Sequence, residues 1–195
     1  SRGLGDVYKR QNIYKYRIHE QSLTKQRKLQ ISMQLMKMRK QYLDNIINMC
    51  NNEKYILCSI YCDFMLEEYL DNVSRNKLIK AVPEVNAICE GVPSEQIVIY
   101  GAGNIGKKAY ALYKDSVLYY ADQNPLLYGK KINGVEVILP DKISEIQSKF
   151  DIVIALSTDK IYSAIKQLEK YNVKKYLYKD CLLYTSPSPR DTERS

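Results

Sequence analysis

Apolar residues recur at helical spacing in the first half of the chain. Residues 22–52 contain no Gly or Pro, and their apolar positions lie three or four residues apart, at Leu35, Met38, Tyr42, Ile46 and Met49. This spacing predicts an amphipathic helix whose apolar stripe packs against the protein and whose basic face lies in solvent. The alternative for this Met-rich, basic segment is a helix that binds a partner or a membrane surface. A second helix is predicted over 54–70 and a shorter one before Pro83, followed by a linker around residues 91–94.

Short apolar runs replace this spacing after residue 95. The runs at 96–100 and 151–156 are continuous and β-branched, which predicts strands buried on both faces of a parallel sheet. Further strands are predicted at 117–121, 135–138 and 175–178, and helices at 107–114, at 141–150 with Asp141 as its N-cap, and at 160–170. Strand and helix alternate, so the sequence predicts the α/β class: a helical N-terminal segment followed by a small doubly wound, mostly parallel Rossmann-like sheet.

A glycine motif follows the first of these strands and opens a helix. It reads Gly101-Ala102-Gly103-Asn104-Ile105-Gly106. In such a motif the first glycine permits a tight turn, the second lets backbone N–H groups approach a pyrophosphate, and the third lets helix and strand pack closely. Asp122 ends the second strand about 20 residues after Gly101, where an acid suits a pair of ribose hydroxyls. The pattern favours nucleotide binding by the loop residues and Asp122; the alternative is that the glycines serve packing alone.

Composition narrows the possible functions. The 195 residues are 45% hydrophobic, which supports a packed core, and no apolar run reaches the roughly 18 residues of a membrane-spanning helix. The net charge of +8 suggests an anionic partner, and much of it comes from residues 12–43, where eight Lys or Arg accompany Glu20 alone. The cysteines form no CxxC pair, so a structural zinc site is poorly supplied and we expect reduced thiols.

Both ends of the chain resemble translated sequencing adapters. Back-translation of residues 1–11 and 181–191 gives one DNA stretch in opposite orientations, and this stretch contains the transposon end used to prepare sequencing libraries. We therefore expect residues 1–11 and 181–195 to be adapter-derived tails. The insert, about residues 12–180, has its first Met at Met33, so we expect an internal fragment of a longer protein.

The second half resembles a family of bacterial domains. The segments IVIYGAGNIGKKAYAL, ADQNP, YGKKINGVEVILPDKI and DIVIAL are similar to the Rossmann-like nucleotide-binding domains of cell-surface polysaccharide synthesis. The family commonly has Asp-Asn-Asn-Pro after the second strand, and this chain has Asp122-Gln123-Asn124-Pro125. The resemblance implies that Asn124 joins Gly101, Gly103, Asn104, Ile105, Gly106 and Asp122 in binding a sugar nucleotide or NAD.

A shorter segment in the first half carries a second resemblance. Residues 13–24, IYKYRIHEQSLT, are similar to a segment near the end of the catalytic domain of family 2 glycosyltransferases. In that fold a late His often ligates the divalent metal that holds the donor diphosphate, which implies a metal-binding role for His19. A neutral imidazole can act as a metal ligand, and the alternative is a hydrogen-bonded structural residue.

Together these observations predict a fragment of a bacterial polysaccharide-synthesis glycosyltransferase that carries a nucleotide-binding or sugar-nucleotide-binding domain. We expect adapter tails at 1–11 and 181–195, a glycosyltransferase tail and helical connector over 12–92, and the Rossmann-like domain over 93–180. The fragment is expected to be inactive, while the parent would use a divalent metal and a glycan acceptor. We expect no nucleic-acid partner and a cytoplasmic protein, with peripheral association at the inner face of the membrane as an option. The alternatives are an NAD-dependent oxidoreductase or epimerase of sugar nucleotides, and a non-catalytic regulatory Rossmann module.

Overall fold

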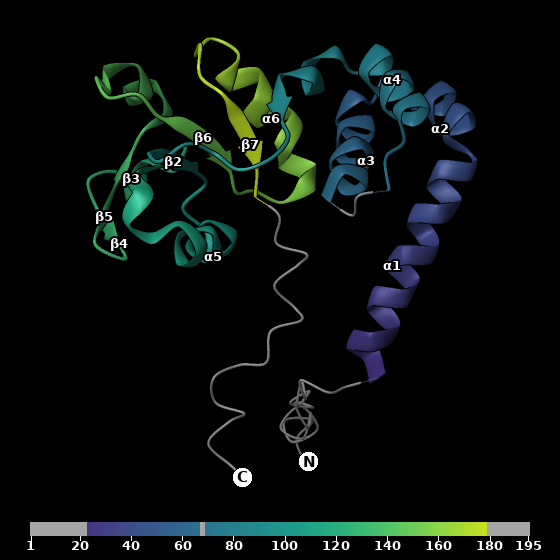
Figure 1. Ribbon diagram of the computed structural model, residues 1–195, viewed down its shortest axis with the longest axis horizontal. Helices are drawn as coiled ribbons and strands as arrows, with labels where there is room; N and C mark the ends of the chain where they lie inside the picture. The colour runs from purple at the N-terminus through teal and green to yellow at the C-terminus, as the bar shows by residue number, and fades with distance from the viewer. Residues whose placement is uncertain (1–22, 67–68, 179–195) are drawn as a thin grey trace, which may run out of the picture.

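A twisted, mostly parallel sheet forms the centre of the molecule. The computed structural model describes residues 23–66 and 69–178, and within them seven strands lie in the order β1-β7-β6-β2-β3-β5-β4 (Figure 1). Neighbouring strands are parallel except for the antiparallel pair β4 and β5. The strands are β1 (Ile88–Cys89), β2 (Ile97–Tyr100), β3 (Val117–Ala121), β4 (Lys131–Ile132), β5 (Val135–Ile138), β6 (Asp151–Ile154) and β7 (Lys175–Leu177). The predicted α/β class and doubly wound sheet are confirmed.

Helices cover both faces of this sheet. In the second half, α5 (Asn104–Tyr113) lies on one face and α6 (Thr158–Leu168) on the other (Figure 1). In the first half, α1 (Leu23–Gln41), α2 (Leu43–Met49), α3 (Lys54–Leu66) and α4 (Asn72–Ala81) lie beyond α6. None of the helices in the described ranges combines the length and apolar character that crossing a membrane requires.

The alternation of side chains along β2 divides the interior into two cores. All four residues of β2 are buried, as expected for a central parallel strand. Ile97 and Ile99 pack in the core beneath α5, while Val98 and Tyr100 belong to the core beneath α6. Because successive residues of a strand point to opposite faces of the sheet, the four residues of β2 contribute to the cores under both layers of helices.

Helix α3 extends the second core into the first half of the chain. It packs against α6, and its buried residues are Leu57, Cys58, Ile60, Tyr61, Cys62 and Phe64. The cysteines at 50, 58, 62 and 89 are free thiols.

Strand β1 comes from the stretch before residue 93 and pairs with β7. The sheet therefore begins before the boundary expected at residues 92 and 93.

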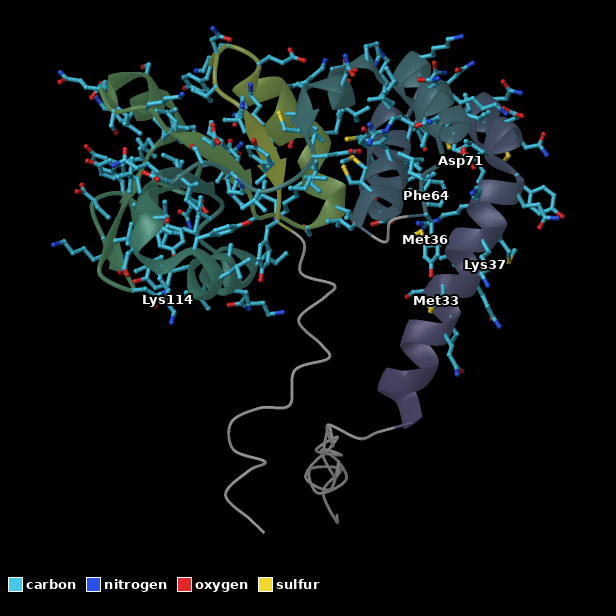
Figure 2. The ribbon with its side chains drawn as sticks, in the orientation of Figure 1. Met33, Met36, Lys37, Phe64, Asp71 and Lys114 are labelled. Atoms are coloured by element: carbon cyan, nitrogen blue, oxygen red, sulfur yellow. The ribbon has the colours of Figure 1, made fainter. Side chains whose placement is uncertain are left out.

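The face of α1 that contacts the protein differs from the predicted one. Residues of the predicted stripe are exposed: Leu35 is 43% exposed, Met38 55%, and Tyr42 51%. Met36 is buried instead, and Figure 2 shows it on the side of α1 that faces α3, with Lys37 on the opposite side. The expectation of a buried stripe along α1 was therefore wrong.

Two ion pairs accompany this orientation of α1. Arg39 Nη1 lies 2.8 Å from Asp63 Oδ2 of α3, and Lys40 Nζ lies 2.8 Å from Asp71 Oδ2. Asp71 is also the N-cap of α4, where its carboxylate accepts a hydrogen bond of 2.7 Å from Ser74 N. The hydrogen bond from Lys40, with that from Ser74, holds the pKa of Asp71 well below its ordinary value.

Three local predictions differ from the structure. The helix predicted over 22–52 is interrupted at Tyr42, whose backbone angles are not helical and which separates α1 from α2. Residues 141–150 do not form an α-helix; a 3-10 turn, Pro140–Glu145, begins after Leu139 and places Ile143 in the core. Asp141 is therefore not an N-cap, because Leu139 occupies that position. Strands β1 and β4, with two residues each, were not predicted because an alternation cannot show in two positions.

Candidate functional site

A cleft lies where the direction of strand addition reverses. From β2 the chain passes through α5 to β3 and β5 on one side, and it then returns to place β6 and β7 on the other side of β2. In open α/β sheets, such a switch point leaves a crevice at the carboxyl ends of the strands, where ligands bind. Here that crevice has a volume of about 570 Å³, in the range of small-molecule sites, and it is lined by the ends of β2, β3 and β6 and the first turns of α5 and α6.

Two of the three motif glycines are required by the fold itself. Gly101 has φ +112°, and a Cβ atom there would lie 2.7 Å from the backbone oxygen of Ala155. A Cβ atom on Gly106 would overlap the carbonyl oxygen of Gly101, so helix α5 can approach β2 only because residue 106 lacks a side chain. Their packing roles were predicted, and they account for glycine at both positions without a ligand.

Gly103 is different, because the chain gives no steric reason for a glycine there. Its φ of −79° suits any residue, and no protein atom lies within 4 Å of the position that its Cβ would take. Gly103 is also the N-cap of α5, and this cap makes no side-chain hydrogen bond. The first N–H groups of α5 are thus left for another acceptor beside the cleft.

Asp122 holds the glycine loop in place. One carboxylate oxygen accepts a hydrogen bond of 2.7 Å from Ala102 N, and the other accepts one of 2.9 Å from Asn124 N. The acid at the end of β3 therefore ties the loop after β2 to its own strand, which the sequence did not predict. Each oxygen has further lone-pair capacity for a ligand hydroxyl.

Most of the predicted site residues line the cleft, and one is buried in the fold. Asn104, Ile105 and Asn124 line the cleft together with Gly101, Gly103 and Asp122, whereas Gly106 is buried against Gly101. The Asn124 side chain also caps a 3-10 turn by accepting a hydrogen bond of 3.0 Å from Leu126 N. Whether these residues bind a nucleotide stays a prediction. His19 lies outside the described residues, and within them no group of three or more His, Cys, Asp or Glu could hold a metal ion.

The sequence missed the wall that α6 contributes. Lys160 and Ser163 line the cleft, and Gln167 lies on the same helical row, one turn further along. Tyr100, at the end of β2, donates a hydrogen bond to Gln167 Oε1. Burial raises the pKa of the Tyr100 hydroxyl. The three-and-four spacing of these polar residues was the available signal, but it does not distinguish a cleft wall from a solvated face.

Comparisons with known proteins give only distant structural matches. No family model and no curated protein matches the chain. A solved structure of RSP, a Rex-family repressor, is 23% identical over 53% of this chain and 51% of that one, with a TM-score of 0.38, so the chain spans about half of that structure. RSP in complex with NADH is 19% identical over 77% of each chain, with a TM-score of 0.37. RSP with NAD⁺ and operator DNA is 17% identical over 76% of this chain and 78% of that one, with a TM-score of 0.35. The strand order, strand directions and cleft position described above establish a Rossmann-like α/β domain.

Proposed function

We propose that the cleft binds a nucleotide whose phosphate lies at the start of α5 and whose ribose lies beside Asp122. Gly103 is the observation that carries this proposal. Packing accounts for Gly101 and Gly106, but the chain itself leaves the space beside Gly103 open. A phosphate that contacts the backbone N–H groups of Asn104 and Ile105 requires that space and gains the favourable field of the helix N-terminus.

The ribose assignment rests on the place and charge of Asp122. Its carboxylate lines the cleft at the end of β3, and both of its oxygens are held by backbone N–H groups. A carboxylate fixed in this way accepts hydrogen bonds from a pair of ribose hydroxyls and repels a 2′-phosphate. NAD and sugar nucleotides meet this requirement, whereas NADP does not.

The side chains in the cleft favour binding over catalysis. Among the described lining residues there is no His or Cys, and the carboxylate of Asp122 is already bonded to two backbone groups. We therefore propose a nucleotide-responsive binding module. The glycosyltransferase parent stays a prediction, since it depends on His19 and on sequence beyond this chain.

Calorimetric titration of the whole chain with NAD, NADP and a panel of UDP- and GDP-sugars tests the proposal. We expect one or more of these nucleotides to bind, with NADP the weakest of the dinucleotides. Gly103→Val should remove binding because its side chain fills the space of the phosphate, while Leu112→Ala, on the exposed side of α5, should leave binding unchanged. If the folded protein binds no nucleotide at millimolar concentration, the proposal is wrong.

A further inference from the structure

The wall of the cleft formed by α6 has no part in the proposed contacts to ribose and first phosphate. Lys160 and Ser163 line the cleft at the end of β6, across the switch point from Asp122. Lys160 is exposed and makes no ion pair within the described ranges. Ser163 donates a hydrogen bond of 2.9 Å to Lys160 O, which leaves its oxygen free to accept one.

A polar cluster adjoins this end of the cleft: Tyr100 and Gln123 line the cleft, and both contact Gln167 of α6. Gln123 Nε2 donates to Gln167 Oε1 at 2.6 Å and to the Tyr100 hydroxyl at 3.3 Å, and Tyr100 donates to the same Gln167 oxygen. The Tyr100 side chain is only 2% exposed, so the cluster is anchored in the core. These bonds use the nitrogen of Gln123 and the oxygen of Gln167, and leave the oxygen of Gln123 and the nitrogen of Gln167 for a polar ligand group.

Charge is distributed unevenly along the cleft. Of the described residues that line it, Asp122 carries the negative charge at the β3 end and Lys160 the positive charge at the α6 end. The start of α5, which also lines the cleft, follows β2, and β2 lies between β3 and β6 in the sheet. A ligand that satisfies all three regions has hydroxyls at one end, a phosphate in the middle and a further anionic group toward α6.

We infer that Lys160, Ser163, Gln123 and Gln167 form a second subsite for the distal phosphate of a nucleoside diphosphate and for the polar group that this phosphate carries. This inference rests on the proposed function, because it presumes that the first phosphate lies at α5. Lys160 binds the second phosphate as a point charge, and the two Gln side chains contact the attached group. The ligand then spans the sheet from β3 to α6.

Matched nucleoside monophosphates and diphosphates test the role of Lys160. The wild-type chain, Lys160→Gln and Lys166→Gln are titrated with UMP, UDP, AMP and ADP by calorimetry. Lys166 is the control, because it is an exposed cation of the same helix whose Nζ lies over the Tyr162 ring at 5.3 Å from its centroid. We expect wild type and Lys166→Gln to prefer the diphosphate, and Lys160→Gln to lose about tenfold in diphosphate affinity, about 1.4 kcal/mol, with little change for the monophosphate. Equal behaviour of the two Lys variants, or an equal loss for both ligand classes, would overturn the inference.

A second variant tests the contact to the attached group. Gln167→Ala should weaken UDP-glucose and NAD relative to UDP and ADP, whereas the Lys160 variant weakens all four. If Gln167→Ala changes none of the four affinities, the group attached to the phosphate does not contact this cluster and the assignment fails. Failure of wild type to bind any of these nucleotides would remove the proposed function as well; binding without diphosphate preference would remove only the second subsite.

Discussion

The contact between α5 and β2 gives a prediction in which two glycines of one motif behave in opposite ways. In Gly106→Ala, the new Cβ overlaps the carbonyl oxygen of Gly101, which belongs to the backbone and cannot rotate away. Helix α5 must therefore shift away from β2. In Gly103→Ser, the new side chain meets no protein atom within 4 Å and the backbone angles are already those of a normal N-cap residue.

The expected size of each effect follows from these contacts. Overpacking costs about 1–3 kcal/mol, and the rigid backbone partner favours the upper end for Gly106→Ala. The better helix propensity of Ala returns about 1 kcal/mol, which leaves a net loss of about 2 kcal/mol. For a chain of this size, this corresponds to a fall in melting temperature of roughly 4–8 °C. Gly103→Ser should instead gain a few tenths of a kcal/mol, because Ser caps a helix slightly better than Gly.

Urea unfolding followed by far-UV circular dichroism measures both variants against wild type, and calorimetry measures their nucleotide binding. We expect Gly106→Ala to be less stable than wild type, and Gly103→Ser to be at least as stable as wild type but weaker in nucleotide binding. A loss of stability in Gly103→Ser equal to that of Gly106→Ala would show that Gly103 also serves packing. A glycine at position 103 would then no longer indicate a phosphate there.

Further predictions concern other parts of the molecule. Asp122→Asn should lower stability by about 1–2 kcal/mol in urea unfolding, since an amide nitrogen would face a backbone donor, and calorimetry should show less discrimination against NADP. Phe64→Ala should cost about 3–5 kcal/mol in the same unfolding assay, because the ring is fully buried on α3. Because the pKa of Asp71 is lowered in the folded state, the ionised carboxylate stabilises the fold at any pH above the ordinary pKa of Asp. This stabilisation is lost as the pH falls toward the lowered pKa of the folded state. Melting temperature between pH 2 and 7 should therefore fall less steeply with acid in Asp71→Asn, which retains a capping side chain. Deletion of residues 1–11 and 181–195 should leave the melting temperature nearly unchanged, and a loss of several degrees would contradict their origin as adapters.

The main strands of the sheet were predictable because the residues of each strand indicate by themselves how that strand is buried. A strand buried on both faces needs apolar residues at nearly every position, and residues 97–100 and 152–154 show this directly. Asp151, at the start of β6, is buried as well, and its carboxylate accepts a hydrogen bond of 2.7 Å from Ser94 N. The glycine motif was equally local, since the turn at Gly101 and the contact at Gly106 each depend on a few neighbouring atoms. Asp122 was found by its distance from the motif, but its two backbone hydrogen bonds depend on how two loops meet.

The orientation of α1 could not be predicted in this way. Its apolar residues are spread over more than one face, so spacing alone does not choose between the stripe through Met38 and the side that carries Met36. The choice is accompanied by ion pairs from Arg39 to α3 and from Lys40 to Asp71, which lie 24 and 31 positions further along the chain. Lys160 was missed for the same reason, because only the strand order brings the start of α6 to the carboxyl end of β2.

Both outer strands of the sheet are unusually short. Beyond β7 lies β1, and beyond β5 lies β4, each with two residues. A strand at the edge of a sheet has unpaired backbone N–H and C=O groups, which can form hydrogen bonds with an extended segment of another molecule. A longer edge strand allows more such hydrogen bonds and therefore stronger pairing. Within residues 23–66 and 69–178, β1 pairs with two residues of β7 and β4 pairs with two residues of β5, so the strand at each margin is only two residues long. The fold thereby protects a strongly β-forming centre from edge-to-edge aggregation, and a chain that began at residue 93 would lose β1 and expose the outer side of β7.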